Sequence, residues 1–442
     1  MSDISSVFAP DFRPTPYWWN LTPPKRLPQQ SLKGSYDVAI VGSGLTGLRT
    51  AIELARAGLN VVVLEREDVG FGAARRNAGY LGRTLKKTYS ELEKHSGSAY
   101  AHEVYAELNA AYQGTLGFIG KEGIDCFATR CGRFIAATSQ AHLDWMVKDA
   151  EKMKQGVGFD YSVIPAHAVR SEMGTDCYCG GIVIPDLGSL HPGLYHSALL
   201  DRALSAGVSI ADHTDVLSIE RIKPAGFAVN TSVGKLTATN VVIATNGYTP
   251  KHLKWYARRL VPFKGYMAAT EELPADLLAE LIPNRRTIID SNINIDFFRP
   301  APDSSRLLFG GSAGSHFTDT NDLAKSMHAI LVRIFPQLHK TRLSAVWSGQ
   351  CAGTFDMMPH IGVDNGLWYG LGFNFAGVPM SGHFGMKIAE GILKNAPPAS
   401  VFARMPFKSI PLYNGNPWFL PLAMRFFAWQ DRALAKSSAR VM

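Results

Sequence analysis

The sequence predicts an α/β (α+β) protein with a Rossmann-like domain built from discontinuous segments and an inserted mixed-sheet domain. Three observations lead to this prediction. A glycine-rich turn joins a strand to a helix after residue 41, similar buried strands return near residues 241 and 368, and residues 259–347 hold longer strands rich in β-branched and aromatic residues. Separated segments of a parallel sheet, together with a second sheet of different character, give this pattern.

The first of these segments, residues 35–66, indicates a nucleotide site. An apolar run suited to a buried strand ends at Val41, and Gly42-Ser-Gly44-Leu45-Thr46-Gly47 follows as G-x-G-x-x-G at the start of an amphipathic helix. The three glycines permit a tight turn, a close backbone approach to a pyrophosphate, and close packing of the helix on the strand. The next apolar strand, 61–64, ends at Glu65, near the spacing expected for an acid that binds a ribose. A purely structural glycine turn is the weaker alternative.

Further elements follow in order along the chain. Helices are expected over 88–122, 139–155, about 192–206 and about 381–393, and strands over 133–137, 241–244 and 368–375. The leading segment is rich in proline and aromatic residues, so we expect it to lie across the folded body. The resulting domain prediction is an extended N-terminal arm (1–34), a nucleotide-binding domain (35–90, 160–250 and 348–410), a substrate domain (91–159 and 251–347) and a C-terminal amphipathic segment (411–442).

Composition limits the function. A net charge of +8 spread along the chain, without a basic tract, argues against nucleic acid as a partner. Five irregularly spaced cysteines give no disulfide framework and favour a reducing, cytoplasmic location, and Cys177-Tyr-Cys179 lacks a second pair, so no metal site is predicted. The N-terminus has no secretory signal pattern, and no apolar run is long enough to span a bilayer.

Several motifs carry a resemblance to a known family. They are Gly70-Phe-Gly-Ala73-Ala-Arg-Arg76-Asn77-Ala78-Gly79, the strand pair from Phe298-Arg299 to Gly311, the stretch from Trp347 to Gly362, and Gly372-Phe-Asn374-Phe375-Ala-Gly377-Val378. With the glycine turn they resemble the D-amino-acid-oxidase-like FAD-dependent oxidoreductases over most of the chain. The arm motif Pro16-Tyr-Trp-Trp19 is similar to the γ-glutamylputrescine oxidoreductase branch, and glycine oxidase and sarcosine oxidase are more distant.

The resemblance implies FAD as cofactor and a reaction in which the carbon next to an amine nitrogen gives hydride to flavin N5. The resulting imine hydrolyses to a carbonyl and an amine. The cofactor-binding residues it implies are Gly42, Gly44, Leu45, Thr46, Gly47, Glu65, Arg66, Ala73, Arg76, Asn77, Ala78, Gly79, Val216, Ala244, Thr245, Gly372, Asn374, Gly377 and Val378. The chemistry belongs to flavin N5, so no catalytic side chain is assigned, and His191 and His360 are interpreted as structural histidines.

Two positions depart from the pattern of the relatives. Cys351 corresponds to the cysteine that sarcosine oxidases bond covalently to flavin and to a carboxylate-binding arginine of glycine oxidase; a packed thiol, a flavin thioether and a pocket contact all stay open. Phe375 replaces a second such arginine. Because an unpaired carboxylate in a dry pocket is costly, a simple amino acid is disfavoured unless Arg299 or another cation reaches in.

The expected substrate pocket contains Tyr266, Phe298, Trp347, Cys351 and Phe375, with Phe297 and Phe373 as further aromatic candidates; ordinary core packing explains these aromatics equally well. Leu308 stands where sarcosine oxidases have an oxygen-activating lysine, which favours a dehydrogenase, and Lys264 is the alternative cation. The partners are therefore an amine substrate and oxygen or another electron acceptor. Alternative functions are oxidation of an N-substituted or cyclic amino acid, and a non-catalytic flavin-binding subunit of an electron-transfer complex.

The C-terminal segment from Trp418 to Arg440 mixes aromatic and basic residues. Such a composition is found in helices that lie at a membrane surface, so peripheral membrane contact is one expectation. Packing against the protein itself or a partner subunit is the favoured alternative, because Pro421 limits the length of a helix there.

Overall fold

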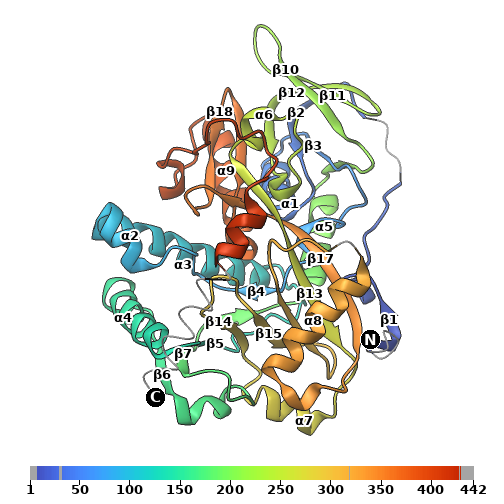
Figure 1. The fold of residues 1–442 in the computed structure, drawn as a ribbon. Helices are drawn as coiled ribbons and strands as arrows, with labels where there is room; N and C mark the ends of the chain where they lie inside the picture. The colour runs from blue at the N-terminus through green and yellow to red at the C-terminus, as the bar shows by residue number, and fades with distance from the viewer. Residues whose placement is uncertain (1–6, 29–31, 318, 428, 430–442) are drawn as a thin grey trace.

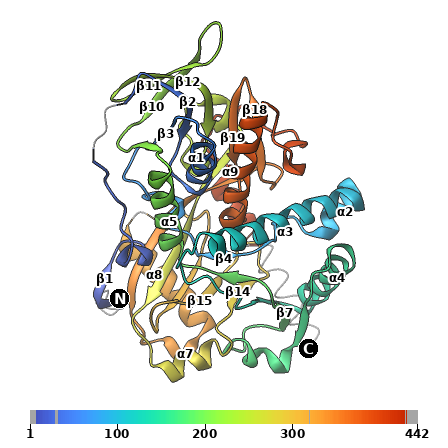
Figure 2. The same ribbon diagram turned by 180° about the vertical axis from the view of Figure 1, so that it is seen from behind.

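Two large sheets form the framework of the protein, one in the upper and one in the lower half of the molecule (Figure 1). The structure is a computed structural model that describes residues 7–28, 32–317, 319–427 and 429. Helices lie against both sheets, and the chain crosses between the two halves several times (Figure 2). The predicted α/β class is confirmed.

The upper sheet has eight strands, and its centre is parallel. Strands β19, β12, β2, β3 and β9 pair in parallel, while β10 and β11 extend the other part of β12 as an antiparallel meander and β18 pairs antiparallel with β19. The bounds are β2 (Ser35–Val41), β3 (Val61–Leu64), β9 (Ser209–Ala211), β10 (Val216–Arg221), β11 (Phe227–Thr231), β12 (Gly234–Ile243), β18 (His360–Asp364) and β19 (Leu367–Leu371).

Successive residues of the central strands pack on opposite faces, and both faces are buried, which explains why these strands are continuous apolar runs. Val38 and Ile40 of β2 pack in a core shared with several helices, whereas Ala39 and Val41 pack on the opposite face with Tyr256. A strand buried on both faces has no solvent-exposed side on which polar residues would be expected. Among the helices of this core are α1 (Leu45–Arg56), α3 (Ser98–Lys121), α5 (Pro192–Ser205) and α9 (Gly377–Lys394), and the short α6 (Lys254–Ala257) adjoins the other face.

The lower sheet has nine strands in the order β1-β17-β13-β16-β15-β14-β5-β7-β6. Its longest pairing is the antiparallel ladder between β13 and β17. Helices α7 (Ala275–Leu281) and α8 (Thr320–Ile334) pack on one face. The bounds are β1 (Phe8–Arg13), β5 (Arg133–Ala136), β6 (Ser162–Pro165), β7 (Gly180–Ile184), β13 (Leu260–Thr270), β14 (Thr287–Asp290), β15 (Phe297–Pro300), β16 (Leu307–Gly311) and β17 (Leu343–Thr354).

Strands β6 and β7 correct one expectation. They lie in segment 160–250, which the sequence placed with the nucleotide domain, yet β7 pairs with β5 and extends the lower sheet. The sequence of a short apolar strand does not reveal which sheet it joins, because tertiary packing decides its partner strand. The exact domain boundaries otherwise stay a prediction.

Smaller elements complete the chain. Helices α2 (Tyr89–Ser96) and α4 (Gln140–Val157) pack beside α3, and β4 (Tyr80–Leu81) pairs with β8 (Gly188–Ser189) in a two-stranded sheet. The 3₁₀ turns are η2 (Tyr17–Asn20), η3 (Ala73–Arg75), η4 (Ala166–Ser171), η5 (Asn246–Tyr248), η6 (Pro336–Leu338) and η7 (Val401–Ala403). Among the described residues, no helix combines the length and apolarity that a bilayer crossing requires.

The N-terminal arm lies across the body, as expected from its aromatics. Strand β1 joins the edge of the lower sheet in parallel with β17, and Trp18 in the following 3₁₀ turn is fully buried. Farther along, Lys25 and Val69 exchange two backbone hydrogen bonds of 3.0 Å. The arm therefore spans from the lower sheet to the upper one.

A glycine substitution tests the packing of α1 on the upper sheet. A Cβ on Gly47 would lie 2.0 Å from the carbonyl oxygen of Gly42, whereas a Cβ on Gly114 of α3 would meet nothing within 4 Å. We predict that Gly47→Ala lowers the free energy of unfolding by about 1–3 kcal/mol through overpacking, and that Gly114→Ala leaves it unchanged or raises it by up to about 1 kcal/mol. Urea unfolding followed by circular dichroism measures both, and equal stability of the two variants would contradict the packing argument.

Candidate active site

The glycine turn has the geometry of an anion site. Gly42 has φ +106°, and the start of α1 at Leu45 follows Gly44, whose position as N-cap offers no side-chain acceptor. A Cβ on Gly44 would meet nothing within 4 Å, so the space beside it is open. The first N–H groups of α1, among them those of Leu45 and Thr46, therefore have no side-chain cap and can face a phosphate group.

Glu65 lies beside this turn at the end of β3. The Ser43 N–H and hydroxyl donate to Oε2 over 3.0 and 2.6 Å, and the Glu67 N–H donates to Oε1 over 3.1 Å. The acceptor capacity of the carboxylate is thus directed at the turn, as a ribose-binding acid requires. The neighbouring Arg66 pairs with Glu67 at 3.4 Å on the surface.

Val216 comes close to Glu65 through the chain before β10. The Thr214 N–H donates to the Glu65 carbonyl over 2.7 Å, and Val216 itself is buried in the core that contains Leu64 and Ala211. The structure therefore brings this residue to the same end of the parallel sheet as the acid. Val216 and Glu65 are far apart in sequence, and the chain that connects β9 to β10 brings them to this end of the sheet.

Two later loops meet the glycine turn. A Cβ on Gly42 would lie 3.0 Å from the Ala244 carbonyl oxygen, so the segment of Ala244 and Thr245 packs directly on the turn. Asn246 then accepts the Gly372 N–H over 2.9 Å, which joins the loop after β12 to the loop after β19. These loops converge because their strands are parallel neighbours that end at the same edge.

The loop after β19 leads to a second uncapped helix. Gly372 has φ +70°, and Asn374 fixes the turn by donating to the Gly372 carbonyl and accepting the Thr354 N–H. Helix α9 then begins at Gly377 and Val378 with Ala376 as N-cap and no side-chain acceptor. Its N-terminus, like that of α1, favours negative charge on a ligand.

Segment 73–79 runs from the upper to the lower sheet, and its carbonyl oxygens are fixed from outside. The Trp347 indole donates to Arg76 O over 2.9 Å, the Trp18 indole to Asn77 O over 2.8 Å, and Arg299 Nη1 to Ala78 O and Gly79 O over 3.0 and 3.3 Å. The Asn77 side chain braces the segment internally, because it donates to the carbonyl of Ala73 and accepts the Gly79 N–H.

The side chain of Arg76 is enclosed rather than free. Its guanidinium lies 4.6 Å from the Trp19 ring and 4.5 Å from the Phe71 ring, and it donates to the carbonyls of Phe71 and Ser348. Burial lowers the pKa of this guanidinium, yet it stays charged at neutral pH. Arg76 therefore joins segment 73–79 to β17.

Strand alternation decides which residues of the lower sheet face segment 73–79. Trp347, Gly349 and Cys351 share one face of β17, with Met267, Gly265 and Phe263 as their partners on β13. A Cβ on Gly349 would lie 3.2 Å from Arg76 Cβ, which places this face against the segment. We call it the segment face, and its members on β15 and β16 are Phe297, Arg299, Leu308 and Gly310.

Tyr266 and Phe298 lie on the opposite face. Both belong to the core under α8, and the Tyr266 hydroxyl donates to Ser315 O over 2.8 Å. Lys264 lies two residues from Tyr266 on β13 and points to the same side, so its side chain does not project from the segment face. The structure thus brings Trp347 and Cys351 together and separates Tyr266 and Phe298 from them, because two residues adjacent along a strand point to opposite sides. The sequence alone did not distinguish the two faces.

Cys351 is a neutral thiol within this arrangement. Burial raises its pKa to about 11, with a smaller opposing effect from a backbone hydrogen bond with Gly265. A Cβ on Gly265 would have the Cys351 sulfur, at 3.6 Å, as its one neighbour within 4 Å. The space next to the Gly265 backbone is therefore open. A planar ring system can approach such a surface closely.

Phe375 has an unusual backbone conformation. Its φ is +73°, a left-handed value that is rare for a bulky residue, and its side chain is 60% exposed. The ring lies 5.3 Å from that of Phe263, and Lys86 Nζ lies 5.5 Å from its centre. Phe375 therefore stands at the rim of the segment face beside Phe263 and a cation.

Arg299 does not reach toward a substrate. The side chain is buried, its Nη1 donates to the carbonyls of Ala78, Gly79 and Leu190, and its Nε donates to Pro300 O. Its charge thus stabilises backbone carbonyls. Of the two histidines, His191 is the N-cap of α5, where its Nδ1 accepts the Leu194 N–H, and His360 pairs with Asp356 in the core.

The sequence reading missed four residues that this region contains. The hydroxyl of Tyr248 accepts the Gln350 N–H, and its ring packs against Gly72. The other three are Trp18, which contacts Asn77, and Phe263 and Lys86, which lie beside Phe375, as described above. Tyr248 follows Asn246-Gly247 closely, and this position after a buried strand was a usable signal. The other three become neighbours of the site only through sheet pairing and chain crossing.

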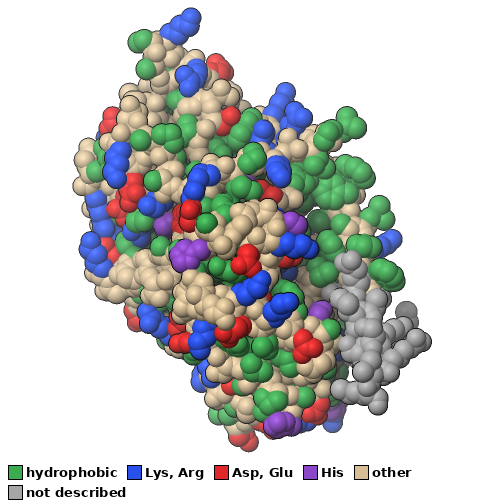
Figure 3. Space-filling model, turned by 90° about the vertical axis from the view of Figure 1, so that its left-hand side faces the viewer, with side chains coloured by type: hydrophobic (Ala, Val, Ile, Leu, Met, Phe, Trp, Pro, Cys, Tyr) green, Lys and Arg blue, Asp and Glu red, His purple; other side chains and the backbone are tan. Residues whose placement is uncertain are grey.

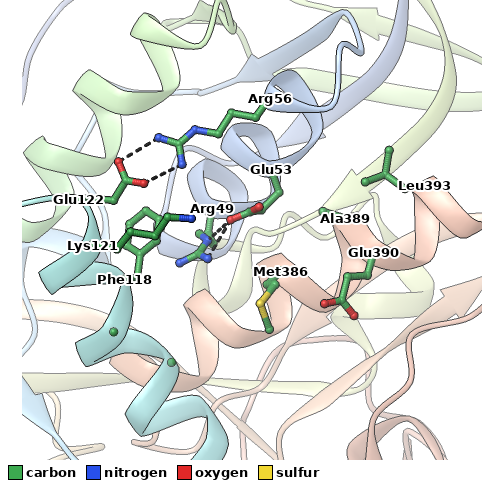
Figure 4. A pocket seen from close by; sticks show the side chains of 12 residues that line it. Arg49, Glu53, Arg56, Phe118, Lys121, Glu122, Met386, Ala389, Glu390 and Leu393 are labelled. Atoms are coloured by element: carbon green, nitrogen blue, oxygen red, sulfur yellow. Dashed lines mark hydrogen bonds and ion pairs between the residues drawn. The ribbon is translucent and has the colours of Figure 1, made fainter.

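Two other polar regions lie apart from these loops. A hollow of about 380 Å³ between α1, α3 and α9 is lined by ion pairs, among them Arg56 with Glu122 and Arg49 with Glu53 (Figure 4). Asp68, Asp212 and His213 bring their ligand atoms within 4.8 Å of one another, but His213 pairs with Asp68 and Asp212 accepts the Leu27 N–H. These groups are satisfied within the protein.

The residues present fit an FAD molecule. The uncapped start of α1, the open space at Gly44 and the acid Glu65 suit a pyrophosphate and a ribose. The bare glycine surface around Gly265 and the uncapped start of α9 suit a flat ring system that carries negative charge. The glycine turn, Glu65 and the start of α9 lie at one edge of the upper sheet, and Gly265 lies on the segment face of the lower sheet.

Comparisons with known proteins agree with this geometry. A family model described as FAD dependent oxidoreductase, DAO, matches residues 37–391. The chain is 30% identical over 377 residues to γ-glutamylputrescine oxidoreductase of Escherichia coli K12, covering 85% of this chain and 88% of the relative. It is 25% identical over 376 residues to glycine oxidase of Geobacillus kaustophilus, covering 80% and 92%.

Solved structures show the same fold. The crystal structure of glycine oxidase from Geobacillus kaustophilus superimposes with a TM-score of 0.70 at 22% identity, covering 86% of this chain and 99% of that one. L-proline dehydrogenase from P. horikoshii gives a TM-score of 0.68 at 17% identity, covering 89% and 99%. At these identities the likeness concerns the fold.

Proposed function

The chain belongs to the DAO family of FAD-dependent oxidoreductases, and from this premise we propose that it oxidises the carbon next to the nitrogen of an amine. FAD is the cofactor, and an amine or amino acid is the class of substrate in the family. When bound, FAD takes up the hydride that leaves this carbon. The protein's own contribution is to orient the substrate, exclude water and hold the amine in its neutral form.

The observation that supports an amine rather than a simple α-amino acid is the lack of an available cation on the segment face. Among its described residues Arg299 is the one charged side chain, and its Nη1 and Nε donate to backbone carbonyls. A carboxylate buried without a cation is costly. An apolar wall also lowers the pKa of a substrate ammonium and favours the neutral amine, which can give up hydride.

A more distant acid group on the substrate remains compatible with the site. Lys86 lies at the rim beside Phe375, with its Nζ 5.5 Å from the ring centre, and it also donates to Ile293 O. We propose that substrates carry their amine toward the segment face and any acid group toward this rim. Trp347 and Cys351 would then border the reacting end, while Tyr266 and Phe298 support the sheet from its other face.

The same surface supports a proposal about the electron acceptor. Leu308 is fully buried on the segment face next to Ala269, and no lysine projects from the described strands on this side. We propose an acceptor other than oxygen, so the enzyme would act as a dehydrogenase. Faster reoxidation by oxygen than by a dye acceptor under equal concentrations would contradict this proposal.

An amine panel tests the proposed substrate class. We predict that the purified holoenzyme, kept without oxygen, loses its flavin absorbance at least about tenfold faster with amines, including amines that bear a distant acid, than with α-amino acids. The reason is the missing carboxylate partner, since a charged hydrogen bond is worth about 1.5–3 kcal/mol. Stopped-flow absorbance at equal substrate concentration gives the rates.

A variant at the rim sharpens this test. Phe375→Arg supplies a cation, and we expect it to speed reduction by α-amino acids by roughly tenfold. Phe375→Leu removes the ring without adding charge and serves as the control. Reduction of the wild type by α-amino acids alone would favour an amino-acid oxidase or dehydrogenase, and no reduction by any amine would favour the non-catalytic flavin subunit.

A denaturing gel tests how the cofactor is attached. We propose that FAD is held without a covalent bond, because formation of a thioether needs a thiolate and the pKa of Cys351 is raised. After denaturation, flavin fluorescence is expected in the supernatant and not in the protein band, for the wild type and for Cys351→Ser alike. A fluorescent band that disappears in Cys351→Ser would show a covalent link.

We further propose that the C-terminal segment contacts an anionic membrane surface. Trp418, Leu422, Phe426 and Trp429 are 69%, 64%, 52% and 59% exposed at intervals of four, four and three residues, and residues 420–427 are helical. Met424 lies instead beside Gly314, so one side packs on the body and the other is bare. Residues 404–442 contain six Lys or Arg and one Asp. Hydrophobic side chains also gather along the right-hand edge of the face in Figure 3.

Vesicle sedimentation tests this contact. The 442-residue chain is expected to bind vesicles of phosphatidylglycerol and phosphatidylcholine at least about tenfold more tightly than phosphatidylcholine alone, since basic residues add attraction to anionic lipid. Trp418→Ser with Phe426→Ser should abolish binding, while Leu217→Ser with Val233→Ser, two other exposed apolar positions, should not. Absence of binding, or a dimer in size-exclusion chromatography that only the first pair removes, would contradict it.

A further inference from the structure

The N-terminal arm contacts segment 73–79 directly and is linked to the glycine turn by a chain of hydrogen bonds. After β1, residues 17–20 form η2, and residues 25–27 then run along the upper sheet. Lys25 pairs with Val69, and the Leu27 N–H donates to Asp212 over 2.7 Å. The stretch between these anchors lies directly against segment 73–79.

Trp18 is the first point of contact. It is fully buried, its indole N–H donates to Asn77 O, and its ring packs edge-on against His191 with centroids 4.7 Å apart. The chain is held in this position by Thr22, whose N–H and hydroxyl both donate to Trp18 O. The arm thus supplies one of the donors that fix the carbonyls of segment 76–79.

Arg75 is the second point of contact. This guanidinium is fully buried, and its Nη1 donates to the carbonyls of Thr22 and Pro23 over 3.0 and 2.7 Å. Burial lowers its pKa to about 10, so it remains charged at neutral pH. The described residues place no carboxylate within ion-pair distance of it, and Nη2 has no partner among them. The two arm carbonyls are therefore essential acceptors for a buried charge.

From Arg75 the contact continues to the glycine turn. Arg75 Nε donates to His196 Nδ1 over 2.9 Å, and since Nε can only donate, Nδ1 must be the acceptor. The proton of the neutral imidazole then resides on Nε2, which donates to Ser43 O over 2.8 Å. Burial, and next the charge of Arg75, lower the pKa of His196 to about 3, which keeps the ring neutral. A chain of hydrogen bonds thus joins the arm to residue 43.

We propose that residues 17–25 form a latch on the FAD site, such that docking of the latch and binding of FAD stabilise each other. The latch fixes segment 76–79 through Trp18 and the glycine turn through Arg75 and His196. Because coupling between two binding events is reciprocal, FAD must hold the latch as firmly as the latch holds FAD. This inference rests on the assignment of these two segments to FAD under the proposed function.

The rate of flavin release tests the latch in the intact holoenzyme. Trp18→Phe keeps an aromatic ring but removes the N–H that reaches Asn77, and Trp368→Phe is the matched control, because its indole donates to Asn240 on a strand outside these contacts. After dilution, free flavin should appear about tenfold faster from Trp18→Phe than from the wild type, and within twofold for Trp368→Phe. Equal release from the two variants, both folded, would overturn the latch.

Amide exchange tests the reciprocal effect in the unaltered chain. Adding FAD to protein from which it has been removed should slow exchange at residues 17–25 at least severalfold and leave β1, residues 8–13, within twofold. This measurement uses the unaltered sequence, so it does not depend on the folding of a variant. Unchanged exchange at 17–25 with FAD bound would overturn the latch, whereas failure of the wild type to bind FAD would overturn the cofactor assignment itself.

Discussion

The backbone carbonyls of residues 76–79 constrain the rest of the site. This segment crosses from one sheet to the other outside their strands, so most of its carbonyls need donors from side chains, and buried carbonyls without donors are costly. Trp347 from β17, Trp18 from the arm and Arg299 from β15 each supply a donor. Three elements far apart in sequence are thereby fixed to one short stretch of chain.

This arrangement also explains the neutral character of the segment face. Arg299 is the one charged side chain among the described residues of this face, and it donates to backbone carbonyls, so the surface offers glycine backbone, a neutral thiol and aromatic rings. A site of this kind matches an uncharged amine better than an α-carboxylate. The proposed substrate class is therefore a consequence of how the protein satisfies its own polar groups.

The two sheets have different roles in this chemistry. The upper sheet directs two uncapped helix N-termini and Glu65 toward one edge, an arrangement that suits the phosphates, ribose and ring system of FAD. The lower sheet presents a face on which alternate residues point to the site and the others to the core under α8. The arm bridges both, and its contacts with segment 73–79 give it the position of a structural partner of the cofactor.

The sequence by itself determined the dinucleotide turn, the acid at Glu65, the buried arm and the family resemblance, because local spacing and period mark a strand, a tight glycine turn and a helix. Only the tertiary structure decided that Tyr266 and Phe298 lie on the far face, that β6 and β7 join the lower sheet, and that Arg299 serves carbonyls. A shift of one residue reverses the side that a strand residue faces, and the pairing that fixes this register comes from residues distant in sequence.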